Sequence, residues 1–251
     1  IQWLKLYDTT PLKTLLADKY LVREWVKEKI GEKYLVPLLG VWEHFDEINF
    51  DCLPDQFVLK TNHGSGWNLI VRCKSDMDLK SSAEKFDQWL KRNYAFVYGL
   101  ELQYMNVPPK ILAETYIADL DGEILDYRFF CFNGKPVYVW VDIGSGTTHH
   151  KRNIYDINWN LQSYKVNYPL IEPAPEKPTT FDEMVECASK LSKDFAFVRI
   201  DFYSVNGRVY FGEMTFTPQS GTGKWEDPEQ NSIYGDLIKL PPKSPLPERK
   251  F

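Results

Sequence analysis

The feature that most constrains the fold is a hairpin signal in the last quarter of the chain. Two runs of apolar, β-branched and aromatic residues, 198–203 and 210–215, flank Asn206-Gly207. This pattern predicts two antiparallel strands joined by a tight turn. Each strand carries one acidic residue, Asp201 in the first and Glu213 in the second. Because a carboxylate is costly to bury alone, both acids need partners.

The two acids allow a functional and a structural interpretation. Side by side on neighbouring strands, Asp201 and Glu213 could hold Mg²⁺, which takes one or two carboxylates together with nucleotide phosphates. Arg199 precedes Asp201 by two residues, so it should point to the same face of the strand. A cation beside two acids fits a phosphate site, but it also fits an ordinary cross-strand ion pair. The hairpin alone leaves both interpretations open.

Bulk properties exclude several classes of protein. The 251 residues are enough for one large domain or two small subdomains, and 43% hydrophobic and 15% aromatic content indicates a globular chain. A net charge of −5 gives no support to a nucleic-acid partner. No apolar run approaches the roughly 20 residues of a membrane span, and no secretion leader is visible. The four scattered cysteines are expected to be reduced thiols, which predicts a cytoplasmic protein.

The remaining patterns predict helices segregated from mostly antiparallel strands, which is an α+β arrangement. Helices are expected over residues 12–30, 81–95 and 180–193, and strands over 57–60, 69–73, 111–117, 126–132 and 136–141. The polar segment 144–178, basic at residues 149–152, is expected to be a long surface excursion, and such segments are often functional or mobile. From residue 241 onward the chain is expected to be a tail.

A second candidate site follows the strand over residues 57–60. Lys60 ends that strand and precedes a small-residue loop with Gly64, Ser65 and Gly66. Backbone N–H groups of such a loop can cradle an anion, and the lysine can add a positive charge. A plain hairpin turn with an exposed lysine explains the same residues.

Other polar residues inside predicted strands need partners too. Glu114 interrupts an apolar strand and requires a donor, such as the amino group of a base. Asp126 and Arg128 share one strand face, where a cross-strand salt bridge is the alternative to a binding role. His149 and His150 are adjacent and lack the spacing of a zinc site, so zinc is not expected.

The order of these features resembles the ATP-grasp superfamily. Segments 53–66, 126–136 and 211–218 resemble, more narrowly, its branch named for TupA, the teichuronopeptide-biosynthesis protein. The resemblance implies an α+β ATP-grasp fold as a single domain over residues 1–251. Two α+β subdomains with antiparallel sheets, approximately 50–115 and 116–240, would enclose ATP, preceded by a helical segment 1–49. Only eighteen residues precede Lys19, so most of the usual N-terminal pre-ATP-grasp domain is expected to be lacking or to lie upstream.

The resemblance also implies roles for individual residues. Lys19 and Lys60 would contact the ATP phosphates, under a lid formed by Gly64, Ser65 and Gly66. The hinge would consist of Glu114, Thr115, Tyr116 and Ile117, with Glu114 reading adenine, and Asp126 would hold the ribose hydroxyls. Asp201 and Glu213 would bind Mg²⁺, with Thr215 standing where most members have Asn as third ligand. Arg199 would stabilise charge on the reacting groups, and Arg128 would face the phosphate or acceptor side.

The function implied by the resemblance is that of an ATP- and Mg²⁺-dependent carboxylate–amine ligase of polysaccharide biosynthesis. It would use an acylphosphate to attach an amino acid or amine to a uronic acid or glycan-linked carboxylate, and other enzymes of polysaccharide assembly are candidate partners. The basic residues 149–152 with 164–165 would build the acceptor site if no upstream domain does. Alternatives are a phosphotransferase on the same fold, a glycosyltransferase using a DxD motif at 119–121 or 76–78, and a non-catalytic nucleotide-binding module.

Overall fold

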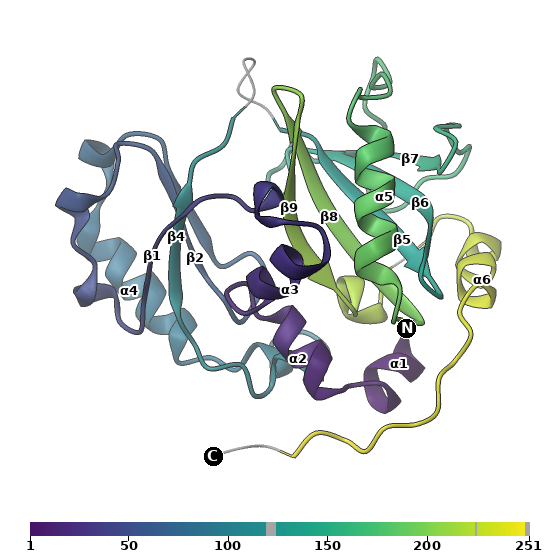
Figure 1. Ribbon diagram of the computed structural model, residues 1–251, viewed down its shortest axis with the longest axis horizontal. Coiled ribbons are helices and arrows are strands. Elements are labelled where there is room, and N and C mark those ends of the chain that lie inside the picture. The colour runs from purple at the N-terminus through teal and green to yellow at the C-terminus, as the bar shows by residue number, and fades with distance from the viewer. Residues whose placement is uncertain (119–123, 224, 249–251) are drawn as a thin grey trace.

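The computed structural model describes residues 1–118, 124–223 and 225–248, and its strands form two antiparallel sheets that occupy opposite halves of the molecule (Figure 1). The four-stranded sheet has the order β1-β4-β2-β3, with strands at Leu38–Trp42, Ile111–Thr115, Phe57–Thr61 and Asn68–Val71. The five-stranded sheet has the order β7-β6-β5-β8-β9, with strands at Lys151–Asp156, Lys135–Ile143, Asp126–Phe132, Phe197–Val205 and Arg208–Thr215. Together with the helices that pack against them, these two sheets confirm the α+β prediction.

The N-terminal helices are shorter than predicted. The expected single helix over residues 12–30 is wrong, because the chain forms α2 (Pro11–Ala17) and α3 (Val22–Lys29) with a break between them. The break occurs where the Asp18 carboxylate accepts hydrogen bonds from the backbone N–H groups of Tyr20 and Leu21, at 2.7 and 3.2 Å. Such local bonds compete with continuation of the helix. Lys19 therefore lies in a turn rather than on a helix face.

The four-stranded sheet is covered by α4 (Leu79–Leu90), and together they bury an apolar core. Phe57 and Leu59 of β2 and Phe86 of α4 are fully buried there. Each such side chain contributes about 1.5–3 kcal/mol relative to an exposed one. The helix predicted over 81–95 ends at Leu90, and Asn93 caps the short helical turn that follows.

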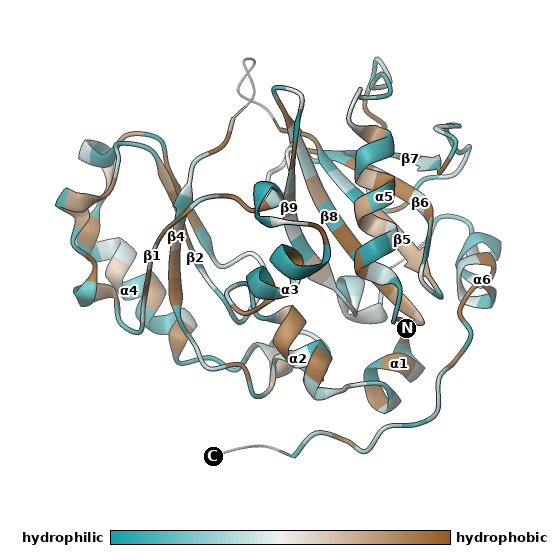
Figure 2. Ribbon diagram, viewed as in Figure 1, coloured by the Kyte–Doolittle hydropathy of each residue, from teal (hydrophilic) through white to brown (hydrophobic). Residues whose placement is uncertain are grey.

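The five-stranded sheet is covered by α5 (Phe181–Ser192), which lies across its strands in Figure 1. Phe181, Met184, Ala188 and Leu191 recur at helical spacing and are buried against the sheet. In Figure 2, α5 is banded with hydrophobic and hydrophilic residues, as expected of a helix with one buried side. The remaining helices are α1 (Gln2–Tyr7) and α6 (Pro228–Asp236), with short 3₁₀ turns at Glu32–Tyr34, Phe45–Glu47, Phe50–Cys52, Lys74–Asp76, Tyr94–Phe96, Leu102–Tyr104 and Pro218–Gly221.

Two segments contain strands that the sequence patterns did not predict. The segment 144–178 is not only an excursion, because β7 within it pairs with β6. Its polar residues hid the strand, since Arg152 is buried there through an ion pair with Asp142. The segment 1–49, expected to be helical, also supplies β1 to the four-stranded sheet. No helix among the described residues is long and apolar enough to cross a membrane.

The two predicted Asn-Gly turns both form. At Asn133-Gly134 and Asn206-Gly207 all four residues have left-handed φ angles of 49, 79, 51 and 72°. Two consecutive left-handed residues match the twist of a two-residue hairpin, which explains the preference for Asn-Gly. The turn predicted at Asp121-Gly122 lies outside the described residues. Residues 241–248 have no regular secondary structure, as expected of a tail.

Candidate active site

A β-bulge at Gly212 brings the two hairpin acids to one face of the sheet. The two-residue turn pairs Val205 with Arg208. If that register continued along the strands, Gly212 would lie opposite Asp201, and the Glu213 side chain would point to the other face of the sheet. The register instead shifts so that Glu213 lies opposite Asp201. A Cβ at position 212 would lie 3.1 Å from the Asp201 carbonyl oxygen, so the close approach favours glycine.

Arg199 lies at the centre of the predicted metal ligands. Its Nη2 donates to Asp201 Oδ2 at 2.6 Å, to Glu213 Oε1 at 2.9 Å and to Thr215 Oγ1 at 3.0 Å. The structural interpretation of the hairpin as a cross-strand ion pair is therefore correct, and the oxygens also converge as a metal site requires. In the described residues no cluster of three or more His, Cys, Asp and Glu could hold a metal by itself. Two carboxylates and a hydroxyl nevertheless fit a Mg²⁺ ion whose coordination is completed by nucleotide phosphates.

The two carboxylates are tuned in opposite directions. Burial raises the pKa of Asp201 to about 6, although Arg199 and Arg128 favour its ionised form. Burial also disfavours ionisation of Glu213, but Lys19 and Arg199 outweigh it and lower the pKa of Glu213 to about 2. Both groups are thus predominantly anionic at neutral pH, the state that binds a cation.

Lys19 joins the two halves of the molecule. From the turn between α2 and α3, its Nζ donates to the carbonyl oxygen of Gly64 in the predicted lid loop and lies 3.4 Å from Glu213 Oε2. The buried Asn62 holds this turn by donating to Asp18 at 2.9 Å. Gly64 is required here, because a Cβ would lie 2.7 Å from the Tyr94 ring. The loop and the acidic hairpin therefore meet at one lysine.

The predicted adenine and phosphate contacts on the four-stranded sheet pair with one another. Glu114 Oε2 forms an ion pair with Lys60 Nζ, and Glu114 Oε1 lies 3.2 Å from Arg23 Nη1. Glu114 has 9% of its side chain exposed, so both cations offset the cost of burying it. Thr115 ends β4, and Tyr116 and Ile117 follow it as the chain leaves the sheet. The roles of these residues toward ATP remain predictions.

Arg128 links three acids on the five-stranded sheet. It donates to Asp126 at 2.9 Å, pairs with Asp142 at 2.9 Å and approaches Asp201 Oδ2 at 3.9 Å. Asp126, predicted to hold ribose, also accepts a hydrogen bond from Ser145. The three acids raise the pKa of the Arg128 guanidinium, in spite of burial.

Sequence reasoning missed Asp142 and Glu101. Asp142 has no exposed surface, accepts two 2.6 Å hydrogen bonds from Arg152 and lies 3.1 Å from His150 Nε2. A carboxylate inside the apolar run 137–143 was a usable signal, of the kind that marked Asp201. Glu101 lies between Leu100 and Leu102 in a loop outside any strand or α-helix, where no periodic pattern distinguishes it from a solvated acid.

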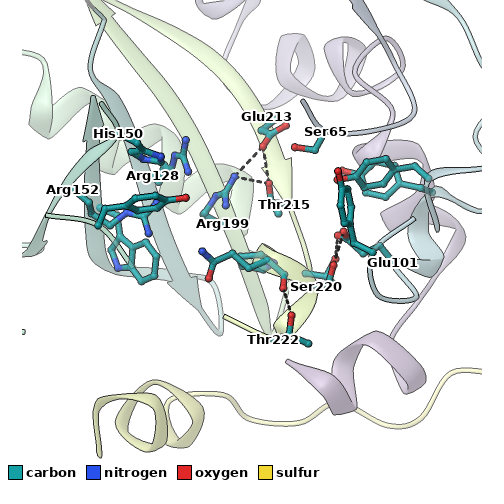
Figure 3. Close-up of a pocket in the computed structure, with 18 residues that line it drawn as sticks. Ser65, Glu101, Arg128, His150, Arg152, Arg199, Glu213, Thr215, Ser220 and Thr222 are labelled. Carbon is teal, nitrogen blue, oxygen red and sulfur yellow. Dashed lines mark hydrogen bonds and ion pairs between the residues drawn. The ribbon is translucent and has the colours of Figure 1, made fainter. Parts of the chain in front are cut away.

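A cavity of about 500 Å³ opens between these groups (Figure 3). Arg128, His150 and Arg152 line one side of it, and Glu101 lies on the opposite side. Arg199, Glu213 and Thr215 lie between the two sides, with Ser65 of the lid loop beside them. The structure thus brings predicted metal, catalytic and lid residues to one cavity. Asp201, Lys19 and Lys60 do not line this cavity, although the first two contact residues that do.

The family described as TupA-like ATPgrasp matches residues 1–239, almost the whole chain. The chain belongs to the TupA-like ATP-grasp family. This match confirms the resemblance drawn from segments 53–66, 126–136 and 211–218. A search of curated proteins gave no significant match.

Solved structures agree on the ATP-grasp fold. A D-alanine–D-alanine ligase from Bacillus anthracis is similar with a TM-score of 0.52 and 18% identity, over 89% of this chain and 65% of that one. A structure of the ligase from the same organism complexed with ATP gives 0.50 and 15%, over 89% and 63%. The ligase from Helicobacter pylori gives 0.50 and 17%, over 92% and 60%. The chain therefore spans less than two thirds of the length of these ligases, and at these identities the likeness concerns the fold.

Proposed function

We propose that this TupA-like protein is an ATP- and Mg²⁺-dependent carboxylate–amine ligase. It attaches an amino acid or amine to a uronic acid or glycan-linked carboxylate, through an acylphosphate, in polysaccharide biosynthesis. One observation carries the proposal: Arg199 and Glu213 of the acidic hairpin line the same cavity as the basic side chains Arg128, His150 and Arg152. A site that activates a carboxylate with a nucleotide needs both groups of residues together.

The chemistry follows from the charges. When bound, Mg²⁺ would be held by Asp201, Glu213 and Thr215 and would offset charge on the transferred phosphoryl group. Arg199 must turn from these oxygens toward the reacting carboxylate, where its guanidinium stabilises developing negative charge. Lys19 holds the lid loop over the site through Gly64, and a closed loop keeps water away from the acylphosphate.

The class of acceptor follows from the cavity wall. His150 stacks on Tyr168 at 3.7 Å between ring centroids, and the Arg152 guanidinium lies 4.4 Å from the Trp140 ring. An imidazole and a guanidinium held in place beside aromatic rings suit an anionic ligand with a ring, such as a uronic acid. Residues 149–152 were expected to build the acceptor site, and this wall supports that hypothesis. ATP as the nucleotide is supported by family membership and by the ATP complex of the similar Bacillus anthracis ligase.

A thermal-shift experiment tests the nucleotide part of the proposal. At 100 times its Kd, a ligand that binds only the folded state adds about 2.7 kcal/mol, or about 5–10 °C in Tm for a chain of this size. We expect that shift with ATP and Mg²⁺, and not with UDP-glucose. Asp201→Asn should remove the Mg²⁺-dependent part, whereas Asp194→Asn, at an exposed acid, should keep it. An unchanged shift in the Asp201 variant would contradict the metal assignment.

Product analysis tests the reaction. A ligase forms ADP and phosphate in proportion to amide when D-glucuronate or D-galacturonate is supplied with an amine. A phosphotransferase would instead leave a phosphorylated acceptor without any amine. No observation favours a DxD glycosyltransferase: the motif at 119–121 lies outside the described residues, and Asp78 of the other motif caps α4 by accepting from the Ser81 backbone N–H at 3.0 Å.

A further inference from the structure

Glu101 is a buried carboxylate on the cavity wall with no role in the chemistry proposed above. Its residue is 7% exposed, and it faces the cavity from the side opposite the basic residues (Figure 3). Its Oε2 accepts a hydrogen bond from Thr217, and its Oε1 accepts one from Ser220 at 3.0 Å. An ionised carboxylate has about four lone-pair positions, so each oxygen can accept a further donor from the cavity.

The neighbours of Glu101 are themselves fixed. Gln103 donates to Thr217 Oγ1 at 2.7 Å, which leaves the Thr217 proton for Glu101. The buried Lys5 donates to the Ser220 carbonyl oxygen at 2.8 Å and holds the turn that carries Ser220. Ser220 has a left-handed φ of 54°, which costs a non-glycine residue energy and persists only where the surroundings enforce it. The position of the carboxylate is therefore preorganised.

The two charged groups nearest Glu101 have opposite signs, so its own carboxylate is left to attract a cation in the cavity. Lys5 of α1 and Glu213 of β9 are its charged neighbours, and the phenols of Tyr94 and Tyr104 face the same space. Burial raises the pKa of Glu101 above its usual range, opposed by the hydrogen bonds from Thr217 and Ser220. A carboxylate with these properties binds an ammonium group and can also take a proton from it.

We propose that Glu101 binds the ammonium group of the amine substrate and accepts its proton, a role that rests on the ligase function proposed above. The cavity is then polarised: the anionic acceptor lies against Arg128, His150 and Arg152, and the amine lies against Glu101. When the proton moves to Glu101, the nitrogen lone pair attacks the acylphosphate carbonyl and a C–N bond forms. The C–O bond to phosphate breaks, phosphate leaves with the electron pair, and the second nitrogen proton is lost to it.

The experiment separates the two half-reactions with the full chain, Mg²⁺-ATP and D-glucuronate or D-galacturonate. Acylphosphate formation is followed without amine, as migration of ¹⁸O from the β,γ-bridge of ATP. Amide formation is followed by mass spectrometry with two kinds of nucleophile. Glycine and ethanolamine arrive as ammonium ions, whereas hydroxylamine is largely unprotonated at neutral pH and needs no base.

Glu101→Gln should leave ¹⁸O migration within about threefold of wild type, because that step does not use the amine. Amide formation with glycine and ethanolamine should fall by about 10²–10⁴-fold, the usual contribution of a positioned acid or base. Hydroxamate formation with hydroxylamine should fall much less. Glu84→Gln, on the exposed side of α4, is the matched control and should change neither reaction.

Each outcome decides between the two proposals. Wild type that shows no ¹⁸O migration with either uronic acid refutes the ligase function, and this role with it. If ¹⁸O migrates, but Glu101→Gln lowers amide formation with the ammonium nucleophiles and hydroxamate formation with hydroxylamine by the same factor, the role of Glu101 alone is refuted. Glu101 then only anchors the Ser220 turn. Glutamine keeps an acceptor oxygen for Thr217, so the variant should fold. If the Tm of Glu101→Gln is nevertheless lowered, Thr217→Val supplies the comparison, because it removes a hydrogen bond to the Glu101 carboxylate but keeps the charge. Thr217→Val should then reduce amide formation less than Glu101→Gln does.

Discussion

The buried cluster around Asp142 gives the sharpest prediction for stability. Asp142 has no exposed surface, and it accepts two 2.6 Å hydrogen bonds from Arg152, which is only 3% exposed. Arg128 Nη1 forms a further ion pair with Asp142 Oδ2 at 2.9 Å. Asp142→Asn keeps the shape of the side chain but leaves the buried guanidinium without its counter-charge. Breaking a buried pair in this way costs about 3–5 kcal/mol. For a chain of this length that lowers Tm by about 6–20 °C.

The assay is urea unfolding followed by circular dichroism, with calorimetry for Tm. Asp182→Asn is the matched control, because Asp182 pairs with Lys177 at 2.8 Å but has 87% of its side chain exposed. Removing that exposed pair should cost about 0–1 kcal/mol. An Asp142→Asn cost no larger than that of the control would refute the reasoning.

The pH dependence gives the same prediction a second test. Burial opposes ionisation of Asp142, but Arg152 and His150 outweigh it and hold the pKa of Asp142 well below its usual range. A depressed pKa means that the contribution to stability is fully present above the unfolded pKa of about 3.9 and is lost as pH falls through the folded value. The difference between wild type and Asp142→Asn should therefore be constant near neutral pH and shrink below about pH 4. A difference that grows on acidification would contradict the ion-pair explanation.

Three further substitutions have expected outcomes of their own. Gly64→Ala places a Cβ 2.7 Å from the Tyr94 ring, so it should cost about 1–3 kcal/mol in urea unfolding and reduce the thermal shift with Mg²⁺-ATP. An unchanged thermal shift would show that nucleotide binding does not require the loop to pack against Tyr94. Asn62→Ala removes the donor to Asp18 together with the hydrogen bonds of Asn62 to Pro108 and Lys110, and it should cost about 1–3 kcal/mol in urea unfolding. A loss below about 0.5 kcal/mol, the range of surface substitutions, would contradict a stabilising role of Asn62 for the turn. Phe86→Ala in the four-stranded half should cost about 3–5 kcal/mol without altering ¹⁸O migration at permissive temperature.

The outline of the active site was predictable because charge in an apolar strand is rare. Asp201 and Glu213 stood out in runs of β-branched and aromatic residues, and the alternation of side chains placed Arg199 beside Asp201, as observed at 2.7 Å. Glu114 stood out for the same reason, although its partners are Lys60 and Arg23. Partner choice depends on how strands and helices meet, and no local pattern encodes that.

Other features were hidden because tertiary contacts overrode the local pattern. The break between α2 and α3 depends on Asp18, whose carboxylate also accepts from Asn62, forty-four residues away. Strand β7 was obscured because Arg152 is buried by an ion pair to a different strand. Glu101 acquires its place only when the loop at 99–101 packs against the Ser220 turn, where Gly99 allows a close approach.

Gly212 shows how a correct prediction can depend on a detail that was not foreseen. The Asn206-Gly207 turn indicated that Asp201 and Glu213 would be neighbours, but the register of a two-residue turn alone would send Glu213 to the opposite face, among the buried residues of the sheet. The extra residue at Gly212 restores the shared face and therefore creates the Arg199 cluster. A carboxylate on the buried face would require a partner that the core does not offer. The bulge, rather than the turn, is thus the local feature on which any metal or phosphate chemistry at this hairpin depends.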